Sequence, residues 1–154
     1  MLSILKELNL STGVGIDIST KAIKIAQVNS RNLNLIYRAK FKVFDISKFN
    51  MGRYDLIVSN PPYIPSKNIK NLSKDIIDFE PLVALNGGLD GLDLIKKIIY
   101  KSNGLLKKNG LLSIEIGCNQ YLKVSGLLKQ HGFREMNRRC DYNHNVRCII
   151  STKV

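Results

Sequence analysis

The chain is organised around the run Tyr54-Asp55-Leu56-Ile57-Val58-Ser59, which is followed at once by Asn60-Pro61-Pro62-Tyr63. The first run is apolar and β-rich, which predicts a buried strand. Two consecutive prolines cannot continue it, because neither has a backbone N–H to donate to a ladder. Each proline also favours extended backbone in the residue before it, so Asn60 is held extended. The sequence therefore predicts a stiff bend at the carboxyl end of a strand, which is where ligands bind in open α/β sheets.

This bend suits methyl transfer to a planar NH2 group. The lone pair of such a group is delocalised, and two acceptors that grip its N–H bonds would turn that lone pair toward an electrophile. The side-chain oxygen of Asn60 and the carbonyl of Pro61 form a candidate pair, and the ring of Tyr63 can pack on a flat substrate. The alternative is that Asn-Pro only ends the strand in an ordinary turn.

With this tetrapeptide the chain resembles the Asn-Pro-Pro-Tyr amino-methyltransferases, a branch of the S-adenosylmethionine-dependent, Rossmann-like superfamily. A second block is Phe79-Glu80-Pro81-Leu82-Val83-Ala84-Leu85, followed by Gly87-Gly88-Leu89-Asp90-Gly91-Leu92. This block resembles one subgroup, the glutamine methyltransferases that modify the Gly-Gly-Gln loop of peptide-chain release factors. The resemblance implies S-adenosyl-L-methionine as the cofactor and release factors as partners.

The resemblance also implies roles for particular residues. Asn60, Pro61 and Tyr63 would be catalytic. Pro62 and Glu80 would join them in binding the substrate, and Asn60 would also contact the cofactor. Glu80 lies in a polar connection over residues 64–86, and connections of that length are usually functional. Its alternative role is that of an ordinary surface acid.

Two further acids follow predicted strands. Asp17 ends a short buried strand over 14–17, and Ser19 is the predicted N-cap of a helix that runs to about Asn29. A carboxylate at such a junction accepts hydrogen bonds from both ribose hydroxyls in dinucleotide-binding folds, and the resemblance implies this role for Asp17. The alternative is that Asp17 helps Ser19 to cap the helix.

Asp45 follows the next predicted strand, over residues 40–44. The resemblance implies that Asp45 accepts a hydrogen bond from the adenine amino group and that Ile46 lies against the adenine face. An Asp that begins a turn is common, so a purely structural role for Asp45 is the alternative.

Composition limits the remaining possibilities. The chain has 154 residues, 44% of them hydrophobic, which predicts one globular domain. No apolar run is long enough for a membrane span, and no residues have metal-ligand spacing, so neither a membrane nor a metal is expected. The three cysteines, Cys118, Cys140 and Cys148, cannot all pair and predict a reducing, cytoplasmic location.

The net charge of +12 comes from 24 basic and 12 acidic residues. Such a charge can indicate a nucleic-acid surface, but the lysines are scattered, which favours a solvated basic surface. Nucleic acid is therefore a possible partner but not a required one.

The rest of the chain predicts alternating helices and strands. A helix is expected over 89–108, closed by Asn109-Gly110. A strand over 111–116, a helix over 120–130 and an antiparallel hairpin of 133–139 with 146–153 follow.

These elements predict an α/β fold, a Rossmann-like class I methyltransferase sheet that is mostly parallel with an antiparallel C-terminal hairpin. Against the family order 3-2-1-4-5-7-6, the first central strand and its Gly-rich loop are expected to be missing. Residues 1–154 would thus be a partial catalytic domain without the N-terminal helical domain, impaired in cofactor binding. Strands 14–17 and 40–44 should pair with each other but not with strand 54–59. A nucleic-acid amino-methyltransferase acting on adenine or guanine, and a non-catalytic remnant, are the alternative functions.

Overall fold

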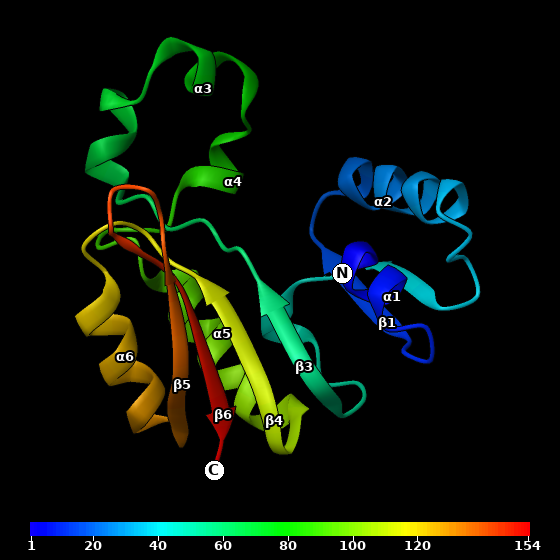
Figure 1. Cartoon of the computed structure of the whole chain (residues 1–154). Helices are drawn as coiled ribbons and strands as arrows, with labels where there is room; N and C mark the ends of the chain where they lie inside the picture. The colour runs from blue at the N-terminus through cyan, green and yellow to red at the C-terminus, as the bar shows by residue number, and fades with distance from the viewer. The chain divides into compact units, whose positions relative to one another are not determined.

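The structure is a computed structural model that describes every residue from Met1 to Val154. The chain divides into two units, Met1–Phe49 and Asn50–Val154. In Figure 1 the first unit is coloured blue to cyan, and the second unit has the remaining colours of the bar, which end in red. Each unit has its own sheet, because its strands pair only with strands of the same unit.

The first unit holds a two-stranded sheet. Its strands are parallel, in a register that runs from Gly13 opposite Ala39 to Asp17 opposite Val43. In chain order the elements are α1 (Leu2–Glu7), β1 (Gly13–Asp17), α2 (Thr20–Asn32), β2 (Ala39–Val43) and the 3-10 helix η1 (Ile46–Lys48).

A small apolar core holds α1 in this unit. Leu5 of α1 is buried together with Leu35 and Ala39. The chain after α1 is fixed by Arg38, whose guanidinium donates hydrogen bonds to three backbone carbonyls between Leu5 and Ser11. These bonds hold the segment that leads into β1.

The second unit contains a four-stranded sheet in the order β3-β4-β6-β5. β3 and β4 are parallel, whereas β6 is antiparallel to both β4 and β5. In chain order the elements are β3 (Tyr54–Ser59), η2 (Ser66–Asn71), α3 (Lys74–Phe79), α4 (Leu82–Leu85), α5 (Asp93–Leu105), β4 (Leu106–Glu115), α6 (Tyr121–Gln130), β5 (Phe133–Cys140) and β6 (Val146–Lys153). The predicted α/β fold with an antiparallel C-terminal hairpin is confirmed.

Two helices supply the core of the second unit. α5 packs on β3 and β4, α6 packs on β5 and β6, and the two helices contact each other. Leu112 and Ile114 alternate along β4 with half-exposed residues and are fully buried, as are Ile95 and Ile99 of α5. This rigid support leaves the loops at the carboxyl ends of β3 and β4 free to carry a site.

Most expected elements are found. The helices expected over 19–29 and 120–130 correspond to α2 and α6, with Ser19 as the N-cap of α2 and Gln120 as that of α6. The strand over 40–44 and the C-terminal hairpin are likewise present.

The helix expected over 89–108 is wrong at both ends, since α5 begins at Asp93 and ends at Leu105. Near its start the backbone at Gly91 has φ +76°, which is outside the helical region. At its end Leu106 leaves the helix and pairs with Tyr54 of β3. β4 therefore begins before the expected strand 111–116, since ladder pairing overrides a local helix preference.

β1 and β3 are more exposed than the sequence predicts. Leu56 and Val58 of β3 are 37% and 53% exposed, and β1 is half-buried over most of its length. β3 is the end strand of its sheet and β1 has a single neighbour, so each has one unpaired edge. Strands 14–17 and 54–59 belong to different sheets, one in each unit, and the expected lack of pairing between them stays a prediction. The expected absence of a central strand stays a prediction.

Candidate functional site

The predicted bend lies at the carboxyl end of β3. Ser59 is the last residue of the strand. Asn60 is exposed, Pro61 is buried, and Pro62 and Tyr63 are half-buried. Neither the Asn60 side chain nor the Pro61 carbonyl has a hydrogen-bond partner within the protein. Neither predicted acceptor is therefore used by a hydrogen bond within the protein.

Tyr63 is bound through its hydroxyl to residues of β4 and β6. Its hydroxyl donates to Oε1 of Glu115 at 3.2 Å and accepts from Nη2 of Arg147 at 2.9 Å. The Arg147 guanidinium also lies over the Tyr63 ring, 5.3 Å from its centroid. Burial raises the pKa of Tyr63 above its ordinary value; the charge of Arg147 opposes this rise and that of Glu115 adds to it.

Gln120 joins three loops at this end of the sheet. It is only 7% exposed. Its Oε1 accepts from the backbone N–H of Gly117 at 2.7 Å, and its Nε2 donates to the carbonyls of Tyr63 at 2.9 Å and Gly91 at 3.3 Å. Every polar group of the Gln120 side chain is thus satisfied by backbone.

Sequence reasoning missed Glu115, Gln120 and Arg147. In the sequence Gln120 only begins the predicted helix 120–130, and Glu115 is one residue of the predicted strand 111–116. One signal was available for Glu115 and Gln120: both lie at or just after the carboxyl end of the predicted strand 111–116, the same sheet edge as the bend. No local signal pointed to Arg147.

The glycine-rich block lies beside the bend. Gly87 donates its backbone N–H to the Ile64 carbonyl at 2.9 Å, and Ile64 donates to the Leu85 carbonyl at 3.1 Å. A Cβ on Gly87 would lie 2.8 Å from the Pro62 carbonyl oxygen. Only glycine allows so close a backbone approach.

Gly91 provides a direct test of this packing. Its φ is +76°, and a Cβ there would collide with the Tyr63 carbonyl oxygen and with the Gln120 amide. We expect Gly91→Ala to lower the free energy of unfolding by about 1–3 kcal/mol, measured by urea denaturation. Gly126→Ala is the matched control, because a Cβ there meets nothing within 4 Å in α6; it should stabilise by about 0.5–1 kcal/mol. Equal effects of the two changes would contradict the proposed close approach.

The segment that contains α3 and α4 exposes apolar side chains. Phe79 is 84% exposed, and Leu82 and Val83 are 56% and 62% exposed. Figure 1 shows α3 and α4 beyond the carboxyl ends of β3 and β4, on the side of the predicted bend. Glu80 belongs to this segment and its side chain is exposed.

The first unit places both predicted cofactor acids at one end of its sheet. Asp17 is the last residue of β1, and Asp45 follows β2, its parallel neighbour. Oδ1 of Asp17 accepts from the backbone N–H of Ser19 at 2.7 Å, and Oδ1 of Asp45 accepts from that of Ser47 at the same distance. The contact given as the alternative for Asp17 is therefore present, and Asp45 caps η1 in the same way. Both carboxylates nevertheless stay exposed to solvent.

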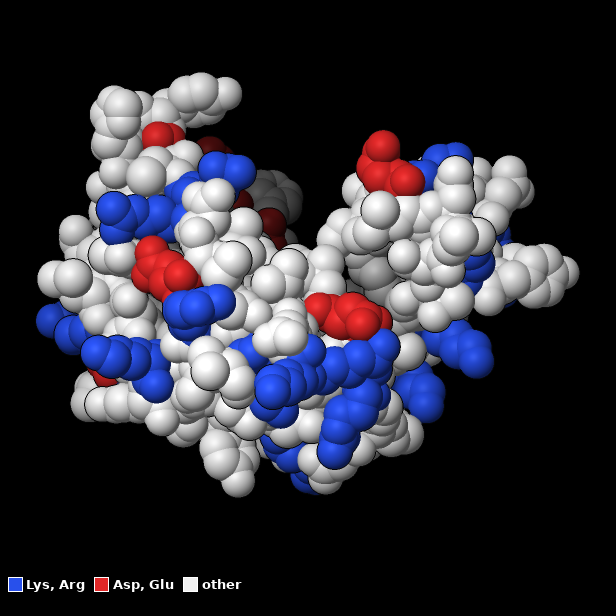
Figure 2. All heavy atoms as spheres, turned by 60° about the horizontal axis from the view of Figure 1, so that its bottom comes forward, with Lys and Arg blue, Asp and Glu red and all other residues white.

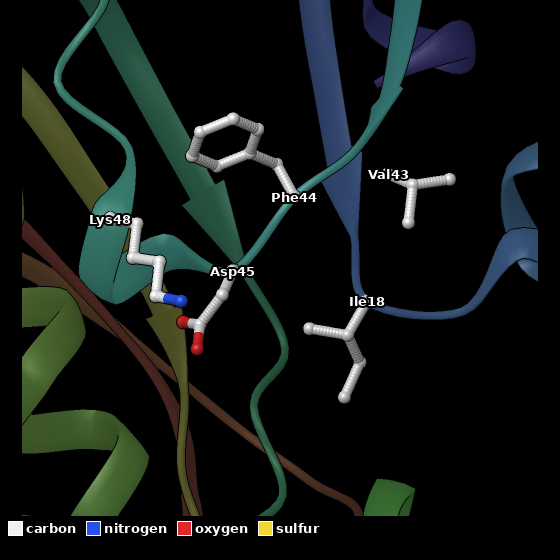
Figure 3. Close-up of a pocket in the computed structure, with 5 residues that line it drawn as sticks. All are labelled: Ile18, Val43, Phe44, Asp45 and Lys48. Carbon is white, nitrogen blue, oxygen red and sulfur yellow. The ribbon is translucent and has the colours of Figure 1, made fainter.

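A shallow pocket of about 280 Å³ opens beside these acids and is lined by Ile18, Val43, Phe44, Asp45 and Lys48. In Figure 3 the side chains of Ile18 and Asp45 extend from the two loops to the same side. Its lining is mostly apolar with a carboxylate at the rim, which fits a flat base with hydrogen-bonding edges. Ile46, the expected adenine contact, lies half-buried in η1; Ile18, which directly follows Asp17, is an apolar wall that sequence reasoning missed.

Charge does not single out a nucleic-acid surface. Figure 2 shows Lys and Arg side chains spread widely over the visible face, with fewer acids between them. No group of His, Cys, Asp and Glu side chains could hold a metal ion. None of the helices has the length and apolar character that crossing a membrane requires.

The fold is that of an α/β methyltransferase domain. The family model described as "Eco57I restriction-modification methylase" matches residues 15–153. The chain therefore belongs to that methylase family, and its resemblance to the release factor glutamine methyltransferases is confirmed.

Similar curated proteins are named release factor glutamine methyltransferase. A release factor glutamine methyltransferase of Clostridium acetobutylicum is 37% identical over 89% of this chain and 49% of its own length. One of Rhodospirillum rubrum is 38% identical over 99% of this chain and 47% of its own length. The chain thus spans about half the length of the curated relatives it matches.

Solved structures agree on the fold. An O-methyltransferase of Nostoc punctiforme, described as putative, has a TM-score of 0.69 at 10% identity, over 99% of this chain and 48% of that one. The N-methyltransferase NodS of Bradyrhizobium japonicum, in complex with S-adenosyl-L-homocysteine, has a TM-score of 0.59 at 13% identity, over 91% of this chain and 65% of that one. At these identities the similarity concerns the fold alone.

Proposed function

We propose that this protein takes part in methylating the side-chain amide nitrogen of a glutamine in the Gly-Gly-Gln loop of peptide-chain release factors, in the cytoplasm. The observation that carries the proposal is the pair of unpartnered acceptors, Asn60 Oδ1 and the Pro61 carbonyl, at the carboxyl end of β3. A primary amide has two N–H bonds, and this pair can accept both. The names of the curated relatives support glutamine as the substrate.

The reaction would depend on positioning. The two acceptors hold the amide N–H bonds, so the nitrogen lone pair is turned away from its own carbonyl and toward the incoming methyl. S-adenosylmethionine would supply that methyl as a sulfonium. As the N–C bond forms, the S–C bond breaks and its electron pair stays on sulfur, and the extra proton on nitrogen passes to water. The Tyr63 ring would pack on the planar amide.

The cofactor would be held by the first unit. Asp17 would accept from the ribose hydroxyls through its exposed carboxylate, which still has Oδ2 available after capping α2. Asp45 would accept from the adenine amino group, and Ile18 and Val43, which line the pocket, would form its apolar walls. Ile46 does not line this pocket, so its expected contact with the adenine face is not part of this proposal.

The exposed segment over 75–83 is a suitable docking surface for the release factor. It combines the exposed side chains of Phe79, Leu82 and Val83 with three acids, Asp75, Asp78 and Glu80, in a chain whose net charge is +12. A basic protein segment with apolar anchors would match both features. Glu80 would bind substrate in this way.

Phe79→Ser tests the docking surface. Burying one Phe side chain is worth about 1.5–3 kcal/mol, so the change should weaken release-factor binding by about 10- to 100-fold, measured by biolayer interferometry. Leu122→Ser on α6 removes a side chain that is 81% exposed and should leave binding unchanged. A similar loss with both variants would contradict a specific surface.

Methylation of a release factor tests the function itself. The chain is incubated with S-adenosylmethionine and a release factor, both alone and joined to the remaining half of the C. acetobutylicum relative. Mass spectrometry should find one added methyl on the Gly-Gly-Gln glutamine and none when that residue is replaced by asparagine. Methylation of adenine or guanine in DNA or RNA, with none on the release factor, would instead establish the nucleic-acid alternative. Absence of transfer from the joined protein would count for a non-catalytic remnant.

A further inference from the structure

Tyr63 is held from two directions by residues that the proposed reaction does not use. Gln120 binds its main-chain carbonyl, and Arg147 and Glu115 bind its hydroxyl. Gln120 lies in the loop after β4, 57 residues from Tyr63 in the sequence. Arg147 lies in β6, 84 residues away, and Glu115 lies in β4, 52 residues away. Such a convergence is not required to end a strand.

The Gln120 contact fixes the backbone of the bend. Its amide is buried, and its Nε2 bridges the Tyr63 and Gly91 carbonyls while its Oε1 holds the Gly117 N–H. Losing the side chain would leave these buried backbone groups without partners, which is costly. Because Pro61 and Pro62 stiffen the chain between Tyr63 and Asn60, fixing the Tyr63 backbone limits movement of both acceptors.

The Arg147 contact fixes the ring. Its guanidinium donates to the hydroxyl and lies over one face of the ring at 5.3 Å. That face is therefore occupied by Arg147, and a planar substrate can pack only on the opposite face. Arg147 itself lies 4.0 Å from Asp141, in the hairpin turn between β5 and β6. The hairpin thus helps to place Arg147 against this face of Tyr63.

We propose that Gln120 and Arg147 are positioning residues, which hold Tyr63 so that the ring face opposite Arg147 and the Asn60–Pro61 acceptors meet the same amide group. The inference rests on the proposed function for the identity of that amide. The geometry of Tyr63 can nevertheless be tested without any methyl transfer.

The test follows Tyr63 by NMR in the full chain labelled with 13Cζ-tyrosine. Tyr63→Phe identifies its signal among the six tyrosines, and each variant is titrated from about pH 9 upward, well past the ordinary tyrosine pKa of about 10, to the highest pH at which the fold persists. Arg147→Gln removes the positive charge that lowers the pKa of Tyr63, so its titration should move to higher pH. Glu115→Gln should move it to lower pH, and Arg147→Lys should restore part of the wild-type behaviour.

The role of Gln120 is tested by substitutions that separate the hydrogen bond of its side-chain oxygen from those of its side-chain nitrogen. Gln120→Glu keeps the acceptor for the Gly117 N–H and removes the donor to the Tyr63 carbonyl, whereas Gln120→Met removes both. Both variants should shift the Tyr63 signal, and only Gln120→Met should expose the Gly117 amide to faster hydrogen exchange. Arg134→Gln, an exposed residue of β5, is the control and should change neither.

Turnover gives a separate readout. In the Gly-Gly-Gln methylation assay, Gln120→Met and Arg147→Gln should lower kcat by about 10- to 100-fold, as expected for misplaced reacting groups, with KM for S-adenosylmethionine unchanged. If the Tyr63 titration is the same in Arg147→Gln as in the wild type, or its signal is unmoved in both Gln120 variants, the positioning role is wrong. If wild type and variants transfer no methyl group while the titrations move as expected, the proposed function fails and the geometry of Tyr63 stands.

Discussion

Asn60→Ala is expected to reduce methyl transfer by about 10²-fold or more, because removing one preorganised hydrogen-bond partner of a reacting group has effects of this size. The Asn60 side chain makes no hydrogen bond within the protein, so the variant loses an interaction with substrate and none with the fold. The free energy of unfolding should stay unchanged within about 0.5 kcal/mol. The rate is measured with the chain joined to the remaining half of its C. acetobutylicum relative.

The control for this prediction is Asn68→Ala. Asn68 is an exposed residue of η2, in the connection that follows the tetrapeptide. Its replacement should leave the rate within about twofold of wild type. Affinity for S-adenosylmethionine should change much less than the rate in Asn60→Ala, since the main role of the side chain is to hold the amide. Full turnover of Asn60→Ala on a release factor would show that the acceptor role is wrong.

Asp17→Ala is the second change with a large expected effect. Two hydrogen bonds from ribose hydroxyls to one carboxylate are worth about 1.5–3 kcal/mol each. Their loss would lower the affinity for S-adenosylmethionine by about 10²- to 10⁴-fold. Isothermal titration calorimetry measures the change directly.

Ser19→Ala separates this effect from helix capping. Asp17 and Ser19 both cap α2, through the N–H groups of Ser19 and Ala22. Removing the Ser19 hydroxyl should lower the free energy of unfolding by about 1 kcal/mol and leave the cofactor affinity unchanged. If Ser19→Ala weakened cofactor binding as much as Asp17→Ala, the carboxylate would act only through the cap.

Local chemistry made several features predictable from the chain alone. The proline pair ends β3 at Ser59 whatever surrounds it, because a residue without an N–H cannot continue a ladder. Ser19 caps α2 as expected, since its hydroxyl reaches the Ala22 N–H three residues along the chain. The positions of Asn60, Asp17 and Asp45 at strand ends follow from the same local rules.

Burial and strand boundaries were less predictable. The run over 54–59 predicts a buried strand, yet β3 ends its sheet and exposes Leu56 and Val58. An apolar run indicates which side chains of a strand can be buried, whereas the strands and helices packed around it determine which of them are buried. For the same reason α5 ends at Leu105, where pairing with β3 replaces the helix that the local sequence favours.

The support of the site was decided only in three dimensions. The sequence places an Asn, two prolines and a Tyr at a strand end, and these residue types set the chemistry of the bend. Gln120 and Arg147 reach Tyr63 only because parallel β3 and β4 end at one edge and β6 returns antiparallel to start there. Local sequence rules act over a few residues, whereas contacts across 57 and 84 residues depend on strand order and register.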